Sequence, residues 1–210
     1  MGVSAMEPVN TRDPSTALRA YMALGWRLTL GHRYRPRQGC TCQNIACPAP
    51  GAHPLLEPLP RLTAATADAA LQTAPGAALI AATSHFDAVI VPSRIGMAAM
   101  TRLETVTPVP CLLHDDQAVL LVLPATGRYA LVHPDVTART GPDGWLALPP
   151  SRDVRWDTPP WMESAGTPHR LLHGSDVGRY LAEAFNAEAV NFSHPLARNE
   201  SAPGNKGALR

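Results

Sequence analysis

The stretch AALIAATSHFDAVIVPSRIGMAAMTRLE, residues 77–104, contains two short apolar runs and then a segment with helical periodicity. Residues 77–83 and 86–91 have the length and apolar character of buried strands. Ser93 is a favourable N-cap for a helix that extends to Glu104. The apolar side of this helix is formed by Ile95, Met97, Met100 and Leu103. This part of the chain therefore predicts two strands followed by a helix.

Further elements are predicted on both sides of this stretch. Helices are predicted at residues 14–24, 66–73 and 175–189, with N-caps at Asp13, Thr66 and Ser175. Strand-like runs occur at residues 26–30, 118–123, 129–133 and 145–148, separated by turn residues. Because helices and strands mix without strict alternation, the order of elements predicts an α+β fold.

The length of 210 residues allows one medium-sized domain with its own hydrophobic core and short tails. We expect this domain at residues 14–165, a C-terminal helical extension at 166–192, a flexible tail at 1–13 and a disordered tail at 193–210. No apolar run reaches the length of about 18 residues that a membrane span needs. The N-terminus lacks the basic and then apolar layout of a signal peptide. We therefore expect a cytoplasmic protein without a membrane partner.

Residues 39–54 read GCTCQNIACPAPGAHP and contain three of the four cysteines. Cys40, Cys42, Cys47 and His53 have the residue types and spacing of a tetrahedral zinc site. Since protein side chains fill all four positions, the pattern favours a structural site over a catalytic one, which keeps a position open. The alternatives are unrelated buried thiols or a disulfide. Three clustered cysteines and the distant Cys111 cannot pair off neatly, which favours zinc.

A basic stretch leads into the cysteine segment, although the net charge of the chain is only +1. Residues 17–38 contain no acid and five arginines. Arg33, Arg35 and Arg37 are candidates for contacts with nucleic-acid phosphates. The alternative is a solvated basic loop without a ligand.

Four landmarks follow one another along the chain: AYMALGW at residues 20–26, GAHP at 51–54, FDAVIV at 86–91, and GPDGWLALPPS at 141–151. In this order, and with the cysteine segment, they resemble the N-terminal domain of bifunctional DNA primase/polymerases (prim-pol) of the archaeo-eukaryotic primase superfamily. The resemblance implies a single α+β domain with a zinc-stapled loop. Its RRM-like mixed or antiparallel sheet would be flanked by helices and carry a nucleotide site.

The resemblance also implies a site where carboxylates hold two divalent metal ions for nucleotidyl transfer. In the family one strand supplies two acids at alternate positions, which here correspond to Ile90 and Pro92. A later strand supplies a third acid, and Thr137 stands at that position. Asp87 lies in the first strand. Asp135 is a candidate substitute for the third acid, because in a strand it would share a face with Thr137.

We therefore expect a zinc-containing primase/polymerase-like domain without polymerase activity, which binds DNA or a replication-related protein in replication or regulation. One acid where three are needed cannot hold two magnesium ions against their hydration. The family's phosphate-contacting histidine is also missing from residues 116–123. The alternative is an active primase/polymerase that uses Mg²⁺ or Mn²⁺ with Asp87 and either Asp135 or Asp115. A third alternative is an interaction protein that binds no DNA.

Overall fold

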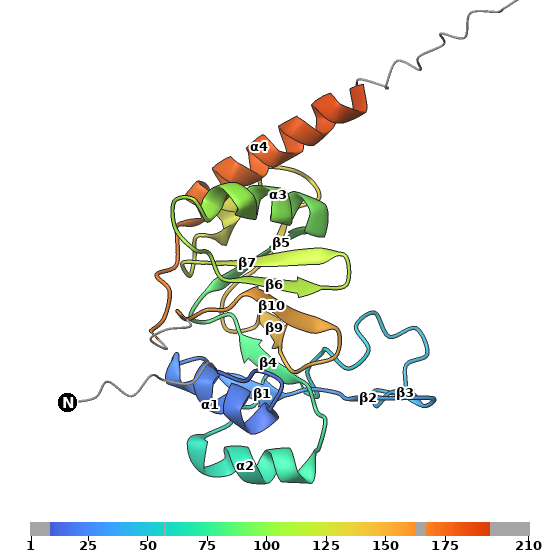
Figure 1. The fold of residues 1–210 in the computed structure, drawn as a ribbon. Coiled ribbons are helices and arrows are strands. Elements are labelled where there is room, and N and C mark those ends of the chain that lie inside the picture. The colour runs from blue at the N-terminus through green and yellow to red at the C-terminus, as the bar shows by residue number, and fades with distance from the viewer. Residues whose placement is uncertain (1–8, 57, 163–166, 194–210) are drawn as a thin grey trace, which may run out of the picture.

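The two apolar runs of residues 77–104 become strands of two different sheets (Figure 1). Strand β4 (Leu79–Ala82) lies in a three-stranded sheet, and strand β5 (Asp87–Pro92) lies in a five-stranded sheet. Helix α3 (Ser93–Leu103) follows β5 directly. The computed structural model describes residues 9–56, 58–162 and 167–193. The two strands and the helix predicted for this stretch are confirmed.

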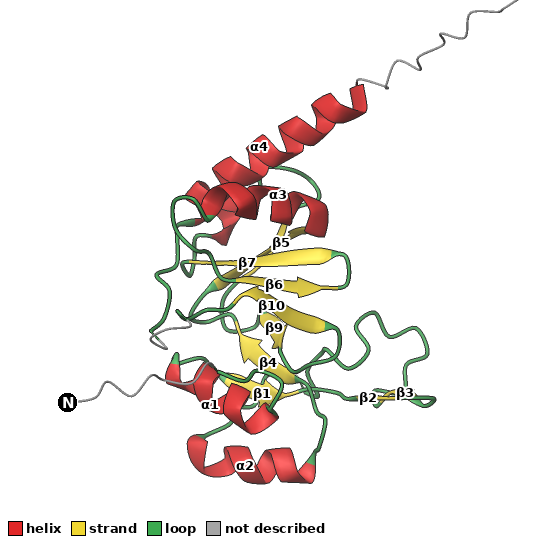
Figure 2. Cartoon of the chain, viewed as in Figure 1, coloured by secondary structure: helices red, strands yellow, loops and turns green. Residues whose placement is uncertain are grey.

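The five-stranded sheet has the order β10-β6-β7-β5-β8, and each neighbouring pair is antiparallel. Its other members are β6 (Cys111–His114), β7 (Gln117–Val122), β8 (Thr137–Arg139) and β10 (Val154–Thr158). The three-stranded sheet is also antiparallel and has the order β1-β4-β9, with β1 (Leu28–Leu30) and β9 (Trp145–Leu148). A separate hairpin, β2 (Tyr34–Arg35) and β3 (Gly39–Cys40), projects from the body (Figure 2).

Helices lie on the two outer sides of the sheets (Figure 1). Helices α3 and α4 (Gly174–Ser193) lie beyond the five-stranded sheet, and α1 (Pro14–Ala23) and α2 (Ala64–Thr73) lie near the three-stranded sheet. A 3-10 helix, η1 (Gly127–Ala130), connects β7 to β8. The described part of the chain is therefore a mixed α+β structure in which antiparallel sheets are flanked by helices.

Strand β5 separates two hydrophobic clusters. Ala88 and Ile90 belong to the cluster between the two sheets, which we call the inter-sheet core. Val89 and Val91 belong to the cluster below α3 and α4, which we call the helix-side core. Successive side chains of a strand point to opposite faces. An uninterrupted apolar run is therefore what a strand buried on both faces requires.

Helix α4 contributes to the helix-side core. Val177 and Leu181 are fully buried there. On the surface, ion pairs between Arg94 and Glu188 and between Arg102 and Glu183 join α3 to α4. Among the described helices, none combines the length and the apolar character that a membrane crossing requires. Residues 1–8 and 194–210, on which most of the two predicted tails fall, lie outside the described residues.

Several local predictions were wrong. Ser93 and Ser175 are helical residues and not N-caps, because α3 begins at Ser93 after the N-cap Pro92 and α4 begins at Gly174. Helix α2 is capped by Thr63 and not by Thr66, which is the third helical residue and accepts a hydrogen bond from the Thr63 N–H in a capping box. Residues 129–133 are not a strand, because the chain turns into η1 at Gly127. The Gly127 N–H donates to Asp87 Oδ2 at 2.7 Å, and this buried bond fixes the start of η1.

Tyr21 links α1 to the segments that follow β9. Its hydroxyl donates to the Pro149 carbonyl at 3.0 Å and accepts from Trp156 Nε1 at 2.8 Å. Its ring stacks on Trp26, with centroids 5.6 Å apart. The side chain is fully buried, and this burial raises the pKa of Tyr21 well above its usual value. The hydroxyl is therefore neutral and serves as a structural hydrogen-bonding group.

We predict that Tyr21→Phe lowers the free energy of unfolding by about 1–3 kcal/mol, because it leaves a buried carbonyl and an indole N–H without their partner. Urea denaturation followed by far-UV circular dichroism measures this change. Tyr129→Phe is the matched control, because Tyr129 is exposed and should tolerate the change within about 0.5 kcal/mol. Equal losses in the two variants would contradict the role of Tyr21.

Candidate metal centre

Cys40, Cys42, Cys47 and His53 converge at one place in the structure. One ligand atom from each lies within 4.8 Å of the others, and Cys40 Sγ is 3.3 Å from His53 Nε2. Around a tetrahedral zinc ion, neighbouring ligand atoms are about 3.5–3.8 Å apart, given usual metal–ligand distances. The four residues are therefore close enough to hold a metal ion, and no open position would remain.

The hairpin and the end of β1 position these ligands. Cys40 is the last residue of β3. His53 is held from β1, because the His32 N–H donates to the His53 carbonyl at 2.8 Å. Gly31 faces the same carbonyl so closely that a side chain there would collide with it. Thr41 completes the support, since its hydroxyl lies 3.0 Å from His32 Nδ1. The four ligands thus come from a loop clamped to the three-stranded sheet.

Local electrostatics favour a cation among the thiols. Burial opposes ionisation of the Cys40 thiol. Hydrogen bonds to this thiol outweigh burial and lower the pKa of Cys40; they come from the backbone N–H groups of Cys42 and Gly51 and from the side chains of Cys42 and His53. Burial and the neighbouring thiols of Cys42 and Cys40 raise the pKa of Cys47. A second thiolate therefore forms reluctantly beside the first, and a bound cation would relieve this repulsion.

The fourth cysteine lies elsewhere. Cys111 is buried on β6 in the helix-side core, and burial raises the pKa of its thiol to about 12. All four cysteines are free thiols, so the disulfide alternative is not realised. Cys111 behaves as a small apolar residue and takes no part in the metal centre.

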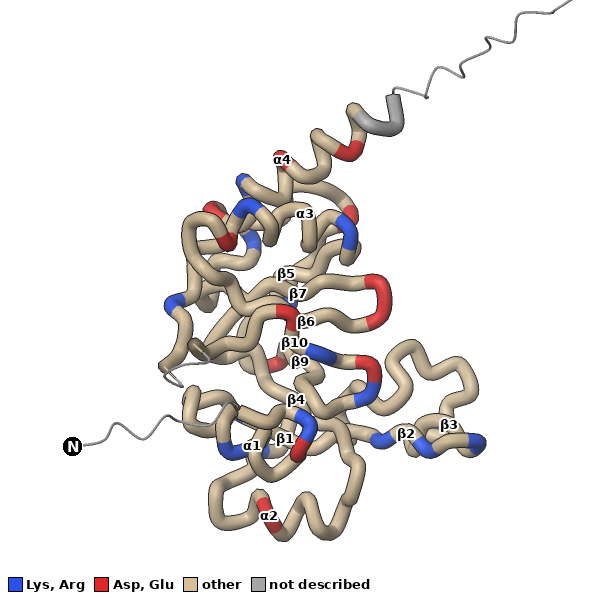
Figure 3. Tube along the Cα trace, viewed as in Figure 1, with Lys and Arg blue, Asp and Glu red and all other residues tan. Residues whose placement is uncertain are grey.

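The three candidate phosphate-binding arginines lie on or next to the β2–β3 hairpin, which Figure 3 shows as a basic segment remote from α3 and α4. Arg35 and Arg37 are exposed. Arg33 is half-buried and donates to the Pro75 carbonyl at 2.9 Å. Next to them, the guanidinium of Arg152 stacks 3.4 Å over the Tyr34 ring. The hairpin therefore presents a basic and aromatic surface.

The structure does not bring Asp87 and Asp135 together. Asp87 begins β5 and is fully buried on the helix side of the strand, where one oxygen accepts from Gly127. Asp135 is exposed, precedes β8, and lies 3.6 Å from His133 Nδ1. Because Thr137 pairs with Ile90, Asp135 lies near the far end of β5, about 17 Å from Asp87 at 3.4 Å per residue.

The sheet register brings together the positions that the resemblance assigns to the metal-binding acids. Ile90 pairs with Thr137 on one side and with Val119 on the other. Pro92 pairs with Gln117, which in turn pairs with His114. Directly opposed residues share a face of the sheet. All of these side chains therefore belong to the face that looks toward the three-stranded sheet, and Asp87 belongs to the other face.

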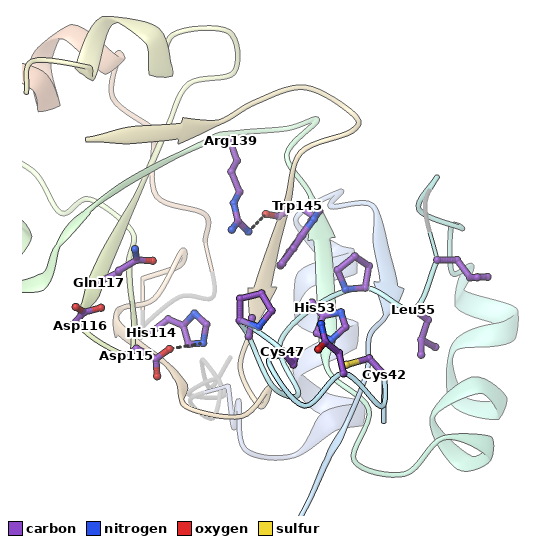
Figure 4. A pocket seen from close by; sticks show the side chains of 15 residues that line it. Cys42, Cys47, His53, Leu55, His114, Asp115, Asp116, Gln117, Arg139 and Trp145 are labelled. Carbon is purple, nitrogen blue, oxygen red and sulfur yellow. Dashed lines mark hydrogen bonds and ion pairs between the residues drawn. The ribbon is translucent and has the colours of Figure 1, made fainter. Parts of the chain in front are cut away.

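A cavity of about 650 Å³ opens between the cysteine loop and this face (Figure 4). Its polar lining includes His114, Gln117 and Arg139, with Trp145 beside them. The Arg139 guanidinium lies 4.2 Å from the centroid of the Trp145 ring and donates to the Trp145 carbonyl at 2.9 Å. A smaller recess lined by the same four residues reaches Ile90 and Val119. The cavity thus borders both the metal centre and the expected nucleotide site.

Other acidic and histidine residues form no second metal cluster within the described part of the chain. Asp115 and Asp116 form the exposed turn between β6 and β7, at the edge of the cavity, and Asp115 adopts a φ of 52°. His169 and His173 precede α4 and share no metal cluster within the described residues. His173 stacks on Tyr129, with ring centroids 5.2 Å apart.

The sequence did not indicate the grouping of Arg139, Trp145, His114 and Gln117 around one cavity. These residues come from β8, β9, β6 and β7, and no local pattern connects them. Only the pairing of the strands and the packing of one sheet on the other place them together.

Comparison with protein-family models, with curated proteins and with solved structures found no match to this chain.

We predict that the purified protein carries one metal ion per chain and that Cys42→Ser reduces this content to well below one, because a tetrahedral site loses one of four ligands. Elemental analysis by mass spectrometry measures metal per chain. Cys111→Ser is the matched control and should keep a full complement. A full metal content in Cys42→Ser, or none in the parent protein, would refute the site.

Proposed function

We propose that this chain is a zinc-containing, primase/polymerase-like domain that lacks polymerase activity and binds nucleic acid in replication or regulation. The observation that carries this proposal is the register of β5 with β7 and β8. Ile90 pairs with Thr137, and Pro92 lies two residues further along β5; these are the three positions where the resemblance expects metal-binding acids. None of these side chains can coordinate Mg²⁺ as a carboxylate does.

The orientation of Asp87 supports the same proposal. Its carboxylate lies on the helix side of β5, fully buried, and it accepts the hydrogen bond that starts η1. A metal-binding acid must instead reach the face that carries Ile90 and Thr137. Asp87 would therefore be a structural residue in this domain.

The donor set supports zinc as the metal of the centre. Three thiolates and one imidazole are soft or borderline ligands, which suit zinc better than magnesium or calcium. Since all four ligands belong to the chain, the ion would stabilise the cysteine loop and would not activate a substrate. Loss of the ion is then expected to disorder the base of the adjacent hairpin.

The hairpin supports nucleic acid as the partner. Arg35 and Arg37 are exposed, and the Arg152–Tyr34 stack lies beside them. Guanidinium groups bind phosphates, and exposed aromatic rings can stack on unpaired bases. An acidic protein surface would use the same arginines, but it would gain little from the aromatic ring.

We predict no nucleotide incorporation on a primed DNA template with either Mg²⁺ or Mn²⁺, because the expected metal positions lack carboxylates. A primer-extension assay with labelled primer measures this. Incorporation that disappears in Asp87→Ala, while the variant remains folded, would overturn the proposal in favour of an active polymerase.

We predict that single-stranded DNA binds with an affinity that falls as salt rises, and that replacing Arg33, Arg35 and Arg37 together by alanine weakens it. If all three contact phosphates, the slope of log K against log salt should become shallower by about 2, given about 0.7 per phosphate. Fluorescence anisotropy at several salt concentrations measures both quantities.

The matched control replaces three exposed arginines near or on α4, namely Arg128, Arg170 and Arg179. It removes the same charge from a surface far from the hairpin and should leave the slope unchanged. Equal losses in both triple variants would indicate a nonspecific charge effect. Binding without any salt dependence, or no DNA binding at all, would exclude the hairpin as a nucleic-acid surface and favour a protein partner.

A further inference from the structure

Arg139 is a half-buried cation held in a fixed position. It ends β8, its guanidinium stacks on the Trp145 ring, and its Nη1 donates to the Trp145 carbonyl. A guanidinium carries five N–H donors, and this carbonyl is the one protein acceptor that the described residues offer it. The other donors border the cavity beside the cysteine loop, as Figure 4 shows.

The charge of Arg139 has no counter-charge nearby. Within residues 9–56, 58–162 and 167–193, no carboxylate lies in ion-pairing distance of it, and burial lowers the pKa of Arg139 without an opposing charge to offset it. By contrast, four other arginines have acidic partners, namely Arg19, Arg94, Arg102 and Arg152. Removing an unpaired charge from water is unfavourable. Arg139 is therefore ready to accept an anion.

Two further polar side chains border the same space. Gln117 and His114 face each other in the β6–β7 hairpin and line both the cavity and its inner recess with Arg139. An amide N–H₂ and an imidazole N–H are donors that can bind other polar groups of a ligand held in the same cavity. The three groups come from one sheet: His114 and Gln117 lie on the neighbouring strands β6 and β7, and Arg139 lies on β8, which β5 separates from β7.

The rest of the cavity is unlike a simple phosphate site. Pro48, Pro54 and Leu55 add apolar surface to the lining, and Asp115 and Asp116 add negative charge on the side away from Leu55 (Figure 4). A fitting ligand therefore has one anionic group for Arg139, a flat apolar part and hydrogen-bond donors for the aspartates. The volume of about 650 Å³ lies within the range of roughly 300–1,000 Å³ that is usual for small-molecule sites.

We propose that this cavity binds the phosphate monoester of a nucleoside monophosphate, with the phosphate on Arg139 and without a divalent metal ion. A phosphate monoester carries a charge of about −1.5 to −2 at neutral pH, and the guanidinium offsets about one unit of it. A triphosphate would bring further negative charge close to Asp115 and Asp116. The phosphate can belong to a free nucleotide or to the 5′ end of a strand. This site does not require that the hairpin bind nucleic acid.

Titration calorimetry of the metal-loaded protein with adenosine 5′-monophosphate, in buffer without added divalent cations, tests the proposal. We expect binding of this nucleotide, binding of adenosine that is weaker by about tenfold or more, and binding of adenosine triphosphate that is no tighter. Equal affinity for adenosine and its monophosphate would overturn the role of the phosphate. Triphosphate binding that is tighter and depends on Mg²⁺ would overturn the metal-free site.

Arg139→Met keeps the stem that packs on Trp145 but removes the charge, and should weaken monophosphate binding by about tenfold or more. Arg155→Met is the matched control, because Arg155 is exposed on β10 outside the cavity lining, and should bind as the parent does. Gln117 lies at an exposed strand end, and Gln117→Leu should weaken binding about threefold or more. This variant provides the test if Arg139→Met does not fold. Unchanged affinity in the folded variants would refute the site.

Competition distinguishes the two sources of the phosphate. Displacement of the monophosphate by a 5′-phosphorylated oligonucleotide, but not by its unphosphorylated form, would assign the site to strand ends. Displacement by neither would assign it to free nucleotides. The triple hairpin variant separates this inference from the proposed function, because it should lose DNA affinity yet retain monophosphate binding. Loss of monophosphate binding in that variant would contradict the cavity as the binding site.

Discussion

Strand β5 is enclosed between two hydrophobic cores, and this double burial constrains the rest of the domain. Ala88 and Ile90 pack between the sheets, and Val89 and Val91 pack against the helices. Since both faces must be apolar, the strand leaves no room for a row of charged residues on either. Its only acid stands at the first position, where the helix-side core ends and η1 begins. The chemistry of the domain must therefore lie outside this strand.

The chemistry-bearing residues lie instead around the edge of the inter-sheet core. The cysteine loop is clamped to the end of β1 through the backbone of His32 and His53. Across the cavity, β8 presents Arg139, which Trp145 of β9 holds in place. Because the loop belongs to the three-stranded sheet and Arg139 to the five-stranded sheet, the cavity exists only where the two sheets meet. A metal ion would stabilise one wall of it.

Local sequence patterns predicted the elements whose structure is determined by residues close together in the chain. The apolar run of β5 was recognised from consecutive apolar residues, and the helix after it from apolar residues at helical spacing. The four metal ligands were recognised because they are close in the chain and chemically distinctive. Residues 129–133 looked like a strand, but the hydrogen bond from Gly127 to the distant Asp87 turned the chain into η1. A pattern among neighbouring residues cannot predict that bond, because its two partners are 40 residues apart in the chain.

The sequence by itself determined the α+β character, the strands β4 and β5 with helix α3, and the identity of the Cys40, Cys42, Cys47 and His53 cluster. Only the tertiary structure decided which face of β5 carries Asp87, that Asp135 lies far from it, and that Arg139 lines the same cavity as His114 and Gln117. Ligands within one loop are joined by short, stiff stretches of chain. Side chains on neighbouring strands are joined only through register and sheet packing, which depend on contacts between residues far apart in the sequence.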